Sequence, residues 1–199
     1  MKDAKAQASV SASASASAAI ARAEQGLADA QASATASREA ALTPELKAQR
    51  DTALAEPAPA KPDQMNEDTA EGAVVSVGYF LDLYRYAYMT GNTTELEKMS
   101  EDRCKFCRSV IDRATTLHQN GGWADKWDQE ITDYTYYEKI EGYDYNELDV
   151  TINKGQVTSH PGGERDPRIS APEESQILDF AVRYDETRWM VGGVEVLKK

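Results

Sequence analysis

The spacing of apolar residues divides the chain into two parts. Residues 1–68 consist mainly of Ala, Ser, Gln and Pro and contain no aromatic side chain, whereas every Tyr, Phe and Trp lies beyond position 78. A folded core needs large apolar side chains to offset the entropy of ordering the chain. We therefore predict one domain over residues 69–199, preceded by a long low-complexity arm, disordered or partly helical, over residues 1–68.

Helical spacing dominates the first half of the predicted domain. Apolar residues recur at intervals of three and four from Ala70 to Tyr88, which predicts a long helix with one apolar face. Asp68 and Glu71 stand at its start with the spacing of a capping box, and Gly91 follows it as a candidate left-handed cap. The segments predicted to follow as helices are residues 93–99 and 101–119.

The pattern changes to alternation after Trp127. Residues 130–153 read as two extended segments, and strict alternation over residues 178–184 continues across a turn into a last strand. The adjacent Gly192 and Gly193 predict a bulge in that strand. Helices followed by an antiparallel meander define an α+β fold, and we predict three N-terminal helices packed in a curved antiparallel sheet of about four strands.

The arm offers little that a core can use. Ser and Ala alternate near its start and give no face to bury, and we expect residues 19–34 to form at best a transient helix, because short isolated helices are marginal in water. A better helix is expected over residues 43–55, and the Pro-rich residues 56–63 predict a stiff extended spacer. We interpret the arm as a stalk between the domain and an anchor; an unselected disordered tail is the alternative.

The chain carries a net charge of −12, from 34 acidic and 22 basic side chains. Nucleic-acid binding depends on Lys and Arg side chains that displace counterions from phosphates, so we expect no nucleic-acid partner. The acidic residues are spread along the domain and predict a solvated acidic surface. No segment is long and apolar enough to cross a bilayer and no signal peptide is present, so we expect membrane attachment only through an anchor absent from this chain.

A group of short motifs between residues 71 and 123 resembles a family of actinobacterial cell-envelope lipoproteins of unknown function. These motifs are Glu71-Gly72-Ala73, the aromatic-rich first helix, Thr90-Gly91-Asn92, the Cys104/Cys107 pair and Gly121-Gly122-Trp123. The resemblance extends over roughly residues 69–199 and implies a nuclear-transport-factor-2-like, cystatin-like cone, in which a bent antiparallel sheet wraps helices around a pocket. It also implies export, a lipidated cysteine upstream of a stalk, attachment to the outer face of the cell membrane, and no assigned reaction.

The only two cysteines, Cys104 and Cys107, are spaced C-x-x-C and admit three interpretations. A structural zinc site needs four Cys or His ligands, and His118 and His160 lack the spacing to complete one, so we expect no metal. A thioredoxin-like centre belongs to a βαβ context that the pattern does not provide, but a helix start favours a thiolate, so a thiol oxidoreductase remains an alternative. In an exported protein, as the resemblance implies, we expect a structural disulfide at the start of the third helix.

Cone folds hold a pocket between the sheet and the helices. An acid–base enzyme there needs a carboxylate in an apolar pocket and a tyrosine or acid to hold an oxyanion. Asp82, Asp133 and Asp179 are candidate carboxylates, although Asp82 and Asp179 are expected to point to solvent, as is His160 in its Gly/Pro-rich loop. The candidate pocket or sheet-face residues are Tyr84, Tyr88, Tyr134, Tyr136, Tyr184 and Trp189. Tyr at such spacing is most often a core residue with its hydroxyl at the rim, so we name no catalytic residue.

The predicted function is that of a non-catalytic binding or scaffolding module, exported and anchored outside the cell membrane, without a cofactor. Its expected partner is a protein, peptide or cell-wall ligand bound at the mouth of the cone. A small-molecule isomerase or dehydratase that uses a pocket carboxylate and tyrosines is the first alternative. The resemblance also implies a possible homodimer, since proteins with this cone fold often dimerise through the open face of the sheet, and Tyr134, Tyr136 or Trp189 on that face is consistent with it.

Overall fold

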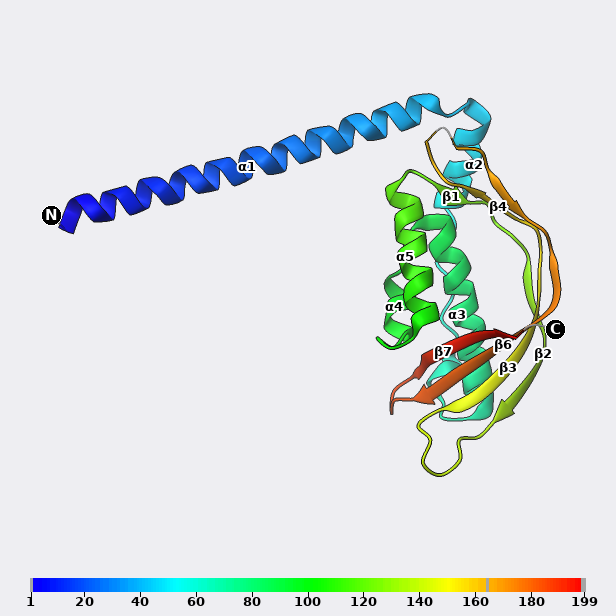
Figure 1. The fold of residues 1–199 in the computed structure, drawn as a ribbon. Helices are drawn as coiled ribbons and strands as arrows, with labels where there is room; N and C mark the ends of the chain where they lie inside the picture. Colours follow the sequence, from blue (N-terminus) through cyan, green and yellow to red (C-terminus); the bar gives the residue numbers. More distant parts are fainter. Residues whose placement is uncertain (1, 164, 198–199) are drawn as a thin grey trace. The chain divides into compact units, whose positions relative to one another are not determined.

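The computed structural model describes residues 2–163 and 165–197 and separates into two compact units, one that ends at Thr43 and one that begins at Pro44 (Figure 1). None of the helices in the described part is both long and apolar enough to cross a membrane. The two units are described separately below.

The first unit is a single helix, α1 (Lys2–Ala41), where the sequence predicted at best a transient one. Its sequence contains no Pro and is rich in Ala, the residue with the highest helix propensity. Ile20 is 59% and Leu27 65% exposed, so neither packs against a core. The helix depends on its own backbone hydrogen bonds and on local side-chain contacts such as that of Gln25 Nε2 with Asp29 Oδ1, over 2.8 Å.

The second unit starts before the predicted domain boundary at residue 69. It includes α2 (Pro44–Leu54) and a 3-10 turn, η1 (Asp63–Asn66). Met65 is buried in the main core, and the indole N–H of Trp189 donates to the carbonyl oxygen of Glu67 over 2.8 Å. This segment has too few apolar residues to show a periodic pattern, so the sequence predicted an arm, although Ala53 and Met65 are buried in the structure.

Three helices follow in the predicted order. They are α3 (Ala70–Thr90), α4 (Thr94–Met99) and α5 (Lys105–Gln119). Thr69, rather than the predicted Asp68, caps α3 by accepting a hydrogen bond from the Gly72 N–H over 3.0 Å. Gly91 ends α3 with a φ of 79°, the left-handed conformation that was predicted for it. The helix α5 starts later than predicted because Cys104 is extended and serves as its N-cap.

Two antiparallel sheets follow the helices, which confirms the α+β class. The larger sheet has the strand order β2-β3-β6-β7 and is the predicted one, whereas the smaller sheet has the order β1-β4-β5. The strands are β1 (Trp123–Ala124), β2 (Gln129–Tyr137), β3 (Asn146–Lys154), β4 (Val157–His160), β5 (Arg168–Ser170), β6 (Glu173–Tyr184) and β7 (Trp189–Leu197). The strands of the smaller sheet are too short to show a recognisable alternation in the sequence.

The predicted bulge lies in β7 at the glycine pair. Ala181 pairs with Gly193 and Val182 with Val191, so Gly192 is the extra residue between them. A Cβ atom at position 192 would lie 2.2 Å from the ring of Tyr145. The bulge therefore also makes room for the tyrosine that precedes β3.

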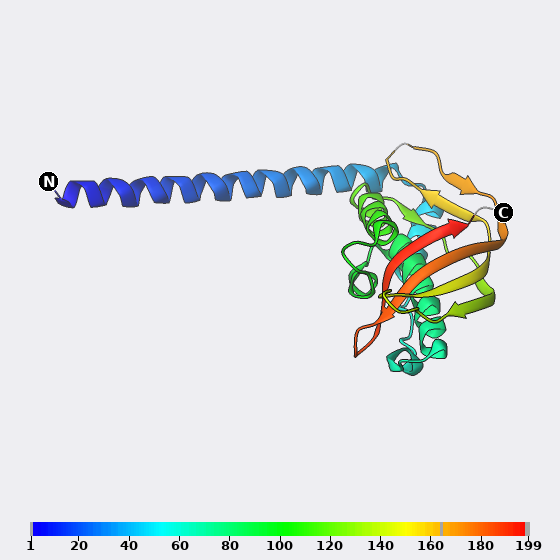
Figure 2. The ribbon, with the colours of Figure 1, turned by 60° about the horizontal axis from the view of Figure 1, so that its bottom comes forward.

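The main core lies between α3 and the inner face of the four-stranded sheet, which curves around this helix (Figures 1 and 2). Phe80 of α3 and Phe180 of β6 meet edge to face, with 5.9 Å between their ring centroids. Alternate residues of the strands, such as Leu148 and Val150 of β3, face the same core. A smaller cluster of Met89, Ala124 and Trp127 joins the end of α3 to the three-stranded sheet.

Candidate functional site

The C-x-x-C motif forms a disulfide at the start of α5. The sulfur atoms of Cys104 and Cys107 lie 2.07 Å apart, and both residues are 0% exposed. Cys104 also caps the helix, because its sulfur accepts a hydrogen bond from the Cys107 N–H over 3.1 Å. Thiol–disulfide exchange requires a thiolate to reach one of the sulfur atoms. The buried bridge therefore works as a clasp on the chain rather than as an exposed reactive centre.

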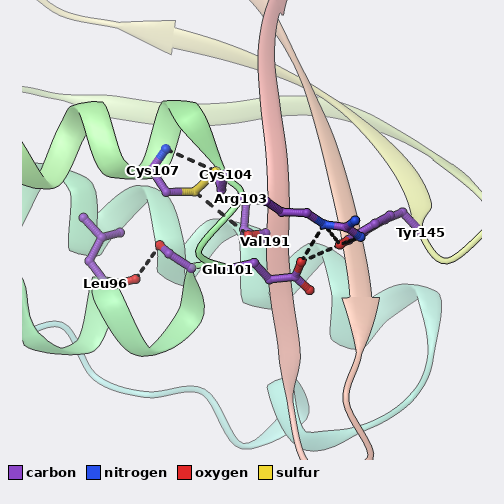
Figure 3. The surroundings of a disulfide bond; sticks show 8 residues. Leu96, Glu101, Arg103, Cys104, Cys107, Tyr145 and Val191 are labelled. Atoms are coloured by element: carbon purple, nitrogen blue, oxygen red, sulfur yellow. Dashed lines mark hydrogen bonds and ion pairs between the residues drawn. A yellow bond between two sulfur atoms is a disulfide. The ribbon is translucent and has the colours of Figure 1, made fainter.

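A buried carboxylate joins this clasp to the sheet (Figure 3). The side chain of Glu101 is 10% exposed and accepts hydrogen bonds from the Tyr145 hydroxyl and from Arg183. Arg103 donates a third hydrogen bond to it over 3.2 Å, and its guanidinium lies 4.6 Å from the centroid of the Tyr145 ring. Burial alone raises the pKa of Glu101, but the hydrogen bonds outweigh burial and hold this pKa below its ordinary value. The segment before α5 is thus fixed to β6 and to the loop before β3.

The clasp lies beside an apolar cavity, which we call the mouth. The mouth has a volume of about 160 Å³ and is lined by α3, the start of α5 and the four-stranded sheet. Its apolar lining is Leu81, Tyr84, Phe106, Ile152, Leu178 and Val196. Phe106 stands between the two cysteines in the sequence, so the disulfide restrains the turn that carries its ring. A motif typical of redox chemistry therefore carries a residue of the cavity wall.

Three polar side chains complete the lining of the mouth: Gln129, Lys154 and Gln176. Lys154 Nζ lies 3.1 Å from Glu173 Oε1, and Gln176 donates a hydrogen bond to the same carboxylate. Gln129 Nε2 donates to the carbonyl oxygen of Leu81 over 3.4 Å. Among the described residues that line the mouth there is no carboxylate, Ser, Cys or His. The mouth can therefore bind an apolar group and hydrogen-bond the polar atoms next to it.

Tyr84 is the one predicted pocket residue that lines the mouth. Burial, reinforced by the neighbouring Tyr88, raises the pKa of Tyr84 above its ordinary value, so its hydroxyl stays protonated at neutral pH. Its ring centroid lies 6.5 Å from that of Phe106 and 6.1 Å from that of Trp127. Tyr88, one turn later, lines a different cavity, and burial raises its pKa as well. Tyr84 thus adds an aromatic ring to the lining of the mouth, with a hydroxyl that stays protonated.

The other predicted site residues do not line the mouth. Tyr134 and Tyr136 pair in register with core-facing residues of β3, so they belong to the inner side of the sheet and not to its open face. The hydroxyl of Tyr184 donates to the carbonyl oxygen of Asn66 over 2.6 Å. Trp189, considered above for the open sheet face, is 1% exposed in the core. Tyr184 and Trp189 thus fix the chain before α3, because both bond to its backbone, whereas Tyr134 is 53% exposed.

The three candidate carboxylates lie outside the mouth. Asp82 is half exposed and pairs with an arginine of its own helix over 3.0 Å, and Asp133 is exposed on β2. Asp179 lies on the outer face of the sheet, in register with Asp149 and Glu195. Burial, followed by repulsion from these neighbouring carboxylates, raises the pKa of Asp179. Among the described residues, the structure therefore brings no carboxylate together with Tyr84 in the mouth.

His160 is buried, contrary to the expectation that its loop exposes it. The residue is 7% exposed and its ring stacks on that of Trp123, with 4.2 Å between the centroids. Its Nε2 lies 3.0 Å from Asp125 Oδ2. Trp123 and His160 are register partners in the small sheet, which the sequence did not reveal, and this pairing is what covers the histidine.

Most of the lining of the mouth was missed by the sequence analysis. Lys154 and Gln176 come from strand ends whose polar pattern is ordinary for solvent-exposed positions. Phe106 carried the one usable signal, since a large apolar side chain inside a two-residue cysteine loop has few neighbours in sequence to pack against. The curvature of the sheet brings these residues together, and no local pattern encodes it.

The comparisons with known proteins add a family and a fold likeness. Residues 48–195 match the model of a family described as "Family of unknown function (DUF6318)". The crystal structure of the intermembrane space region of the chloroplast protein ARC6 is similar in fold, with a TM-score of 0.48 and 15% sequence identity, over 67% of this chain and 99% of that chain. None of the curated proteins matches the chain significantly.

Proposed function

The chain belongs to DUF6318, a family of unknown function, and from this premise we propose that its domain is a non-catalytic binding module whose mouth receives one apolar side chain of a protein or peptide partner. The family carries no assigned reaction, in agreement with the resemblance seen in the sequence. We therefore infer the function from the geometry of the mouth.

The main evidence for the proposal is the volume of the mouth. Pockets for small-molecule substrates and cofactors have volumes of about 300–1,000 Å³, whereas an apolar cavity of about 150 Å³ is large enough for benzene. With about 160 Å³, the mouth fits a single aromatic or branched aliphatic side chain. Its rim of Gln and Lys side chains suits the polar backbone around such a residue, in the manner of an anchor pocket at a protein interface.

The edge of the sheet next to the mouth supports a peptide partner. Apart from an isolated bridge between Ser100 and Val191, β7 pairs only with β6 among the described residues. Residues 195–197 at its end are exposed, and Val196 among them lines the mouth. An extended peptide along this edge forms backbone hydrogen bonds with β7 while one of its side chains enters the mouth.

The two enzymatic alternatives find less support. An isomerase or dehydratase needs a carboxylate near the reacting carbon, and the described lining supplies only a protonated tyrosine and a lysine that is paired with Glu173. A thiol oxidoreductase needs an accessible sulfur, but both cysteines are fully buried. A homodimer through the outer face of the sheet is opposed by the row of Asp149, Asp179 and Glu195, since two such faces repel each other.

The same proposal places the domain outside the cytoplasm, on a lipid anchor upstream of the arm. A disulfide between the two cysteines supports export, because such bonds persist in oxidising compartments. The length of the arm is the evidence for its role as a stalk, since 40 helical residues span roughly 60 Å. Labelling of intact cells with a membrane-impermeant lysine reagent tests this location: the native protein is expected to be labelled without lysis, and labelling only after lysis contradicts it.

A pair of adjacent residues allows a sharp test of the mouth. Val196 lines it and is 49% exposed, whereas Leu197 is 40% exposed and points to the opposite face of the sheet. Titration of the full chain with N-acetyl-phenylalaninamide, followed by NMR, is expected to give saturable shifts in the wild type. Val196→Trp fills the mouth and is expected to weaken binding more than tenfold, whereas Leu197→Trp retains it. Equal binding by the two variants contradicts the proposal.

A further inference from the structure

A second, larger cavity lies between α5 and the small sheet, and we call it the arginine cleft. It has a volume of about 360 Å³ and does not share residues with the mouth. Its charged lining is Arg113, Arg165, Arg168 and Asp112. In the whole chain acidic residues outnumber basic ones, 34 to 22, whereas the described lining of this cavity holds three cations and one carboxylate, the opposite balance.

The three arginines come from three different elements. Arg113 lies on the face of α5 that also presents Leu117 to the cleft, one turn later. Arg168 of β5 is the register partner of Ser159 of β4, so their side chains leave the small sheet on the same side. Arg165 lies in the loop between these strands. The guanidinium groups therefore surround the cleft from a helix, a strand and a loop.

One of these guanidiniums is held in place by the backbone. Arg165 donates to the carbonyl oxygen of Pro161 over 2.5 Å and to that of Gly162 over 3.2 Å. These two bonds leave three of its five N–H groups for a ligand. Within residues 2–163 and 165–197, Arg113 and Arg168 form no salt bridge. Asp112 is the carboxylate in the described lining, so the cleft keeps an excess of positive charge.

We propose that the arginine cleft binds the phosphate group of a phosphate ester. A phosphate offers oxygen atoms in several directions around one centre, which suits guanidiniums from three sides better than the two coplanar oxygens of a carboxylate. Tyr88, Leu117 and Pro161 add an apolar wall that can contact the organic part of the ester. The volume lies within the range of small-ligand pockets and exceeds what a bare phosphate ion needs.

Phenyl phosphate, inorganic phosphate and benzoate are the probes that test this site, in calorimetric titrations of the full chain. Phenyl phosphate is expected to bind saturably and more tightly than either of the others. Arg113→Gln and Arg168→Gln are each expected to weaken it about tenfold, because each removes a charge-assisted contact. Arg108→Gln is the matched control: it removes the same charge from an exposed position of the same helix that does not line the cleft, and it is expected to change the affinity less than twofold.

Vesicles distinguish two sources of the phosphate group. If vesicles of phosphatidylglycerol bind the wild type but not Arg113→Gln, and phenyl phosphate competes with them, the natural ligand is a lipid headgroup; if they do not bind while phenyl phosphate does, it is a soluble ester. Three results overturn the proposal: no saturable binding of phenyl phosphate, equal losses in Arg108→Gln and Arg113→Gln, or benzoate bound as tightly as phenyl phosphate. Because the mouth is a separate cavity, any of these results leaves the proposed function of the mouth untouched.

Discussion

The mouth and the arginine cleft belong to the same domain, but the mouth is lined mainly by apolar side chains and the cleft by polar and charged ones. The apolar side chains of the mouth come from α3, α5 and the large sheet, and the cation in its described lining, Lys154, is paired with Glu173. The cleft is lined by arginines on exposed positions of α5, a loop and β5. The walls of the mouth therefore contribute to folding as well as to binding, whereas the charges of the cleft contribute little to folding.

The largest expected effect is a difference in how much substitutions in the two regions lower the free energy of unfolding. Phe180 is fully buried against Phe80, in the sheet that carries the mouth, and Phe180→Ala is expected to lower the free energy of unfolding by about 3–5 kcal/mol. Arg168→Gln in the cleft is expected to stay within about 0.5 kcal/mol of the wild type. Urea unfolding of the three proteins measures the difference. Losses of similar size in the two variants would contradict this division of roles.

Removal of the disulfide is expected to weaken ligand binding at the mouth but not at the arginine cleft. Replacement of Cys104 and Cys107 by Ala opens a very short loop. The chain-entropy model predicts that the free energy of unfolding falls by about 2 kcal/mol. Phe106 lies inside this loop and lines the mouth, so the double variant is expected to bind N-acetyl-phenylalaninamide more weakly while phenyl phosphate binding stays at the wild-type level. Titration of one sample with both ligands checks this. Parallel loss of both affinities would show that the disulfide supports the whole domain.

The carboxylate beside the clasp predicts a pH dependence. The folded-state pKa of Glu101 is held below its ordinary value, so its ion contributes stability above the unfolded pKa of about 4.3, and this contribution is lost as the pH falls through the folded pKa. Glu101→Gln keeps the shape of the side chain, so this variant is expected to lose less free energy of unfolding than the variant without the disulfide. Melting temperatures from pH 7 to about 3 are expected to converge for wild type and Glu101→Gln. A constant gap over this range, or the same behaviour in the exposed Glu141→Gln control, would refute the assignment.

The smallest expected effect is that of salt on ligand affinity, which should differ between the two cavities. A rise in ionic strength from about 0.1 M to 1 M shortens the Debye length from about 10 Å to 3 Å and screens exposed charges. Phenyl phosphate binding at the cleft is therefore expected to weaken severalfold, whereas N-acetyl-phenylalaninamide at the mouth is expected to bind equally well or slightly better. Calorimetry at the two salt concentrations measures both. A salt-sensitive mouth would mean that its ligand is held by Lys154 rather than by the apolar walls.

The helices and the large sheet followed from periodic patterns, but the mouth did not. The run from Ala70 to Tyr88, the alternation up to Tyr184 and the bulge at Gly192 are local signals, and each is found in the structure. The lining of the mouth depends on how far the sheet bends and on which strand ends meet α5, which is decided by packing over the whole domain. The segment before residue 69 was assigned to the arm for the same reason, since Met65 has no apolar neighbours in sequence that reveal its place in the core.

The most direct test of the mouth is to locate a bound side chain in it. In a protein with labelled Leu and Val methyl groups, intermolecular NOEs connect the phenyl ring of bound N-acetyl-phenylalaninamide with the protein atoms that surround it. The account predicts NOEs to the methyl groups of Leu81, Leu178 and Val196, and their disappearance in Val196→Trp but not in Leu197→Trp. NOEs from the ring to methyl groups on the outer face of the sheet, or none to these three residues, would contradict it.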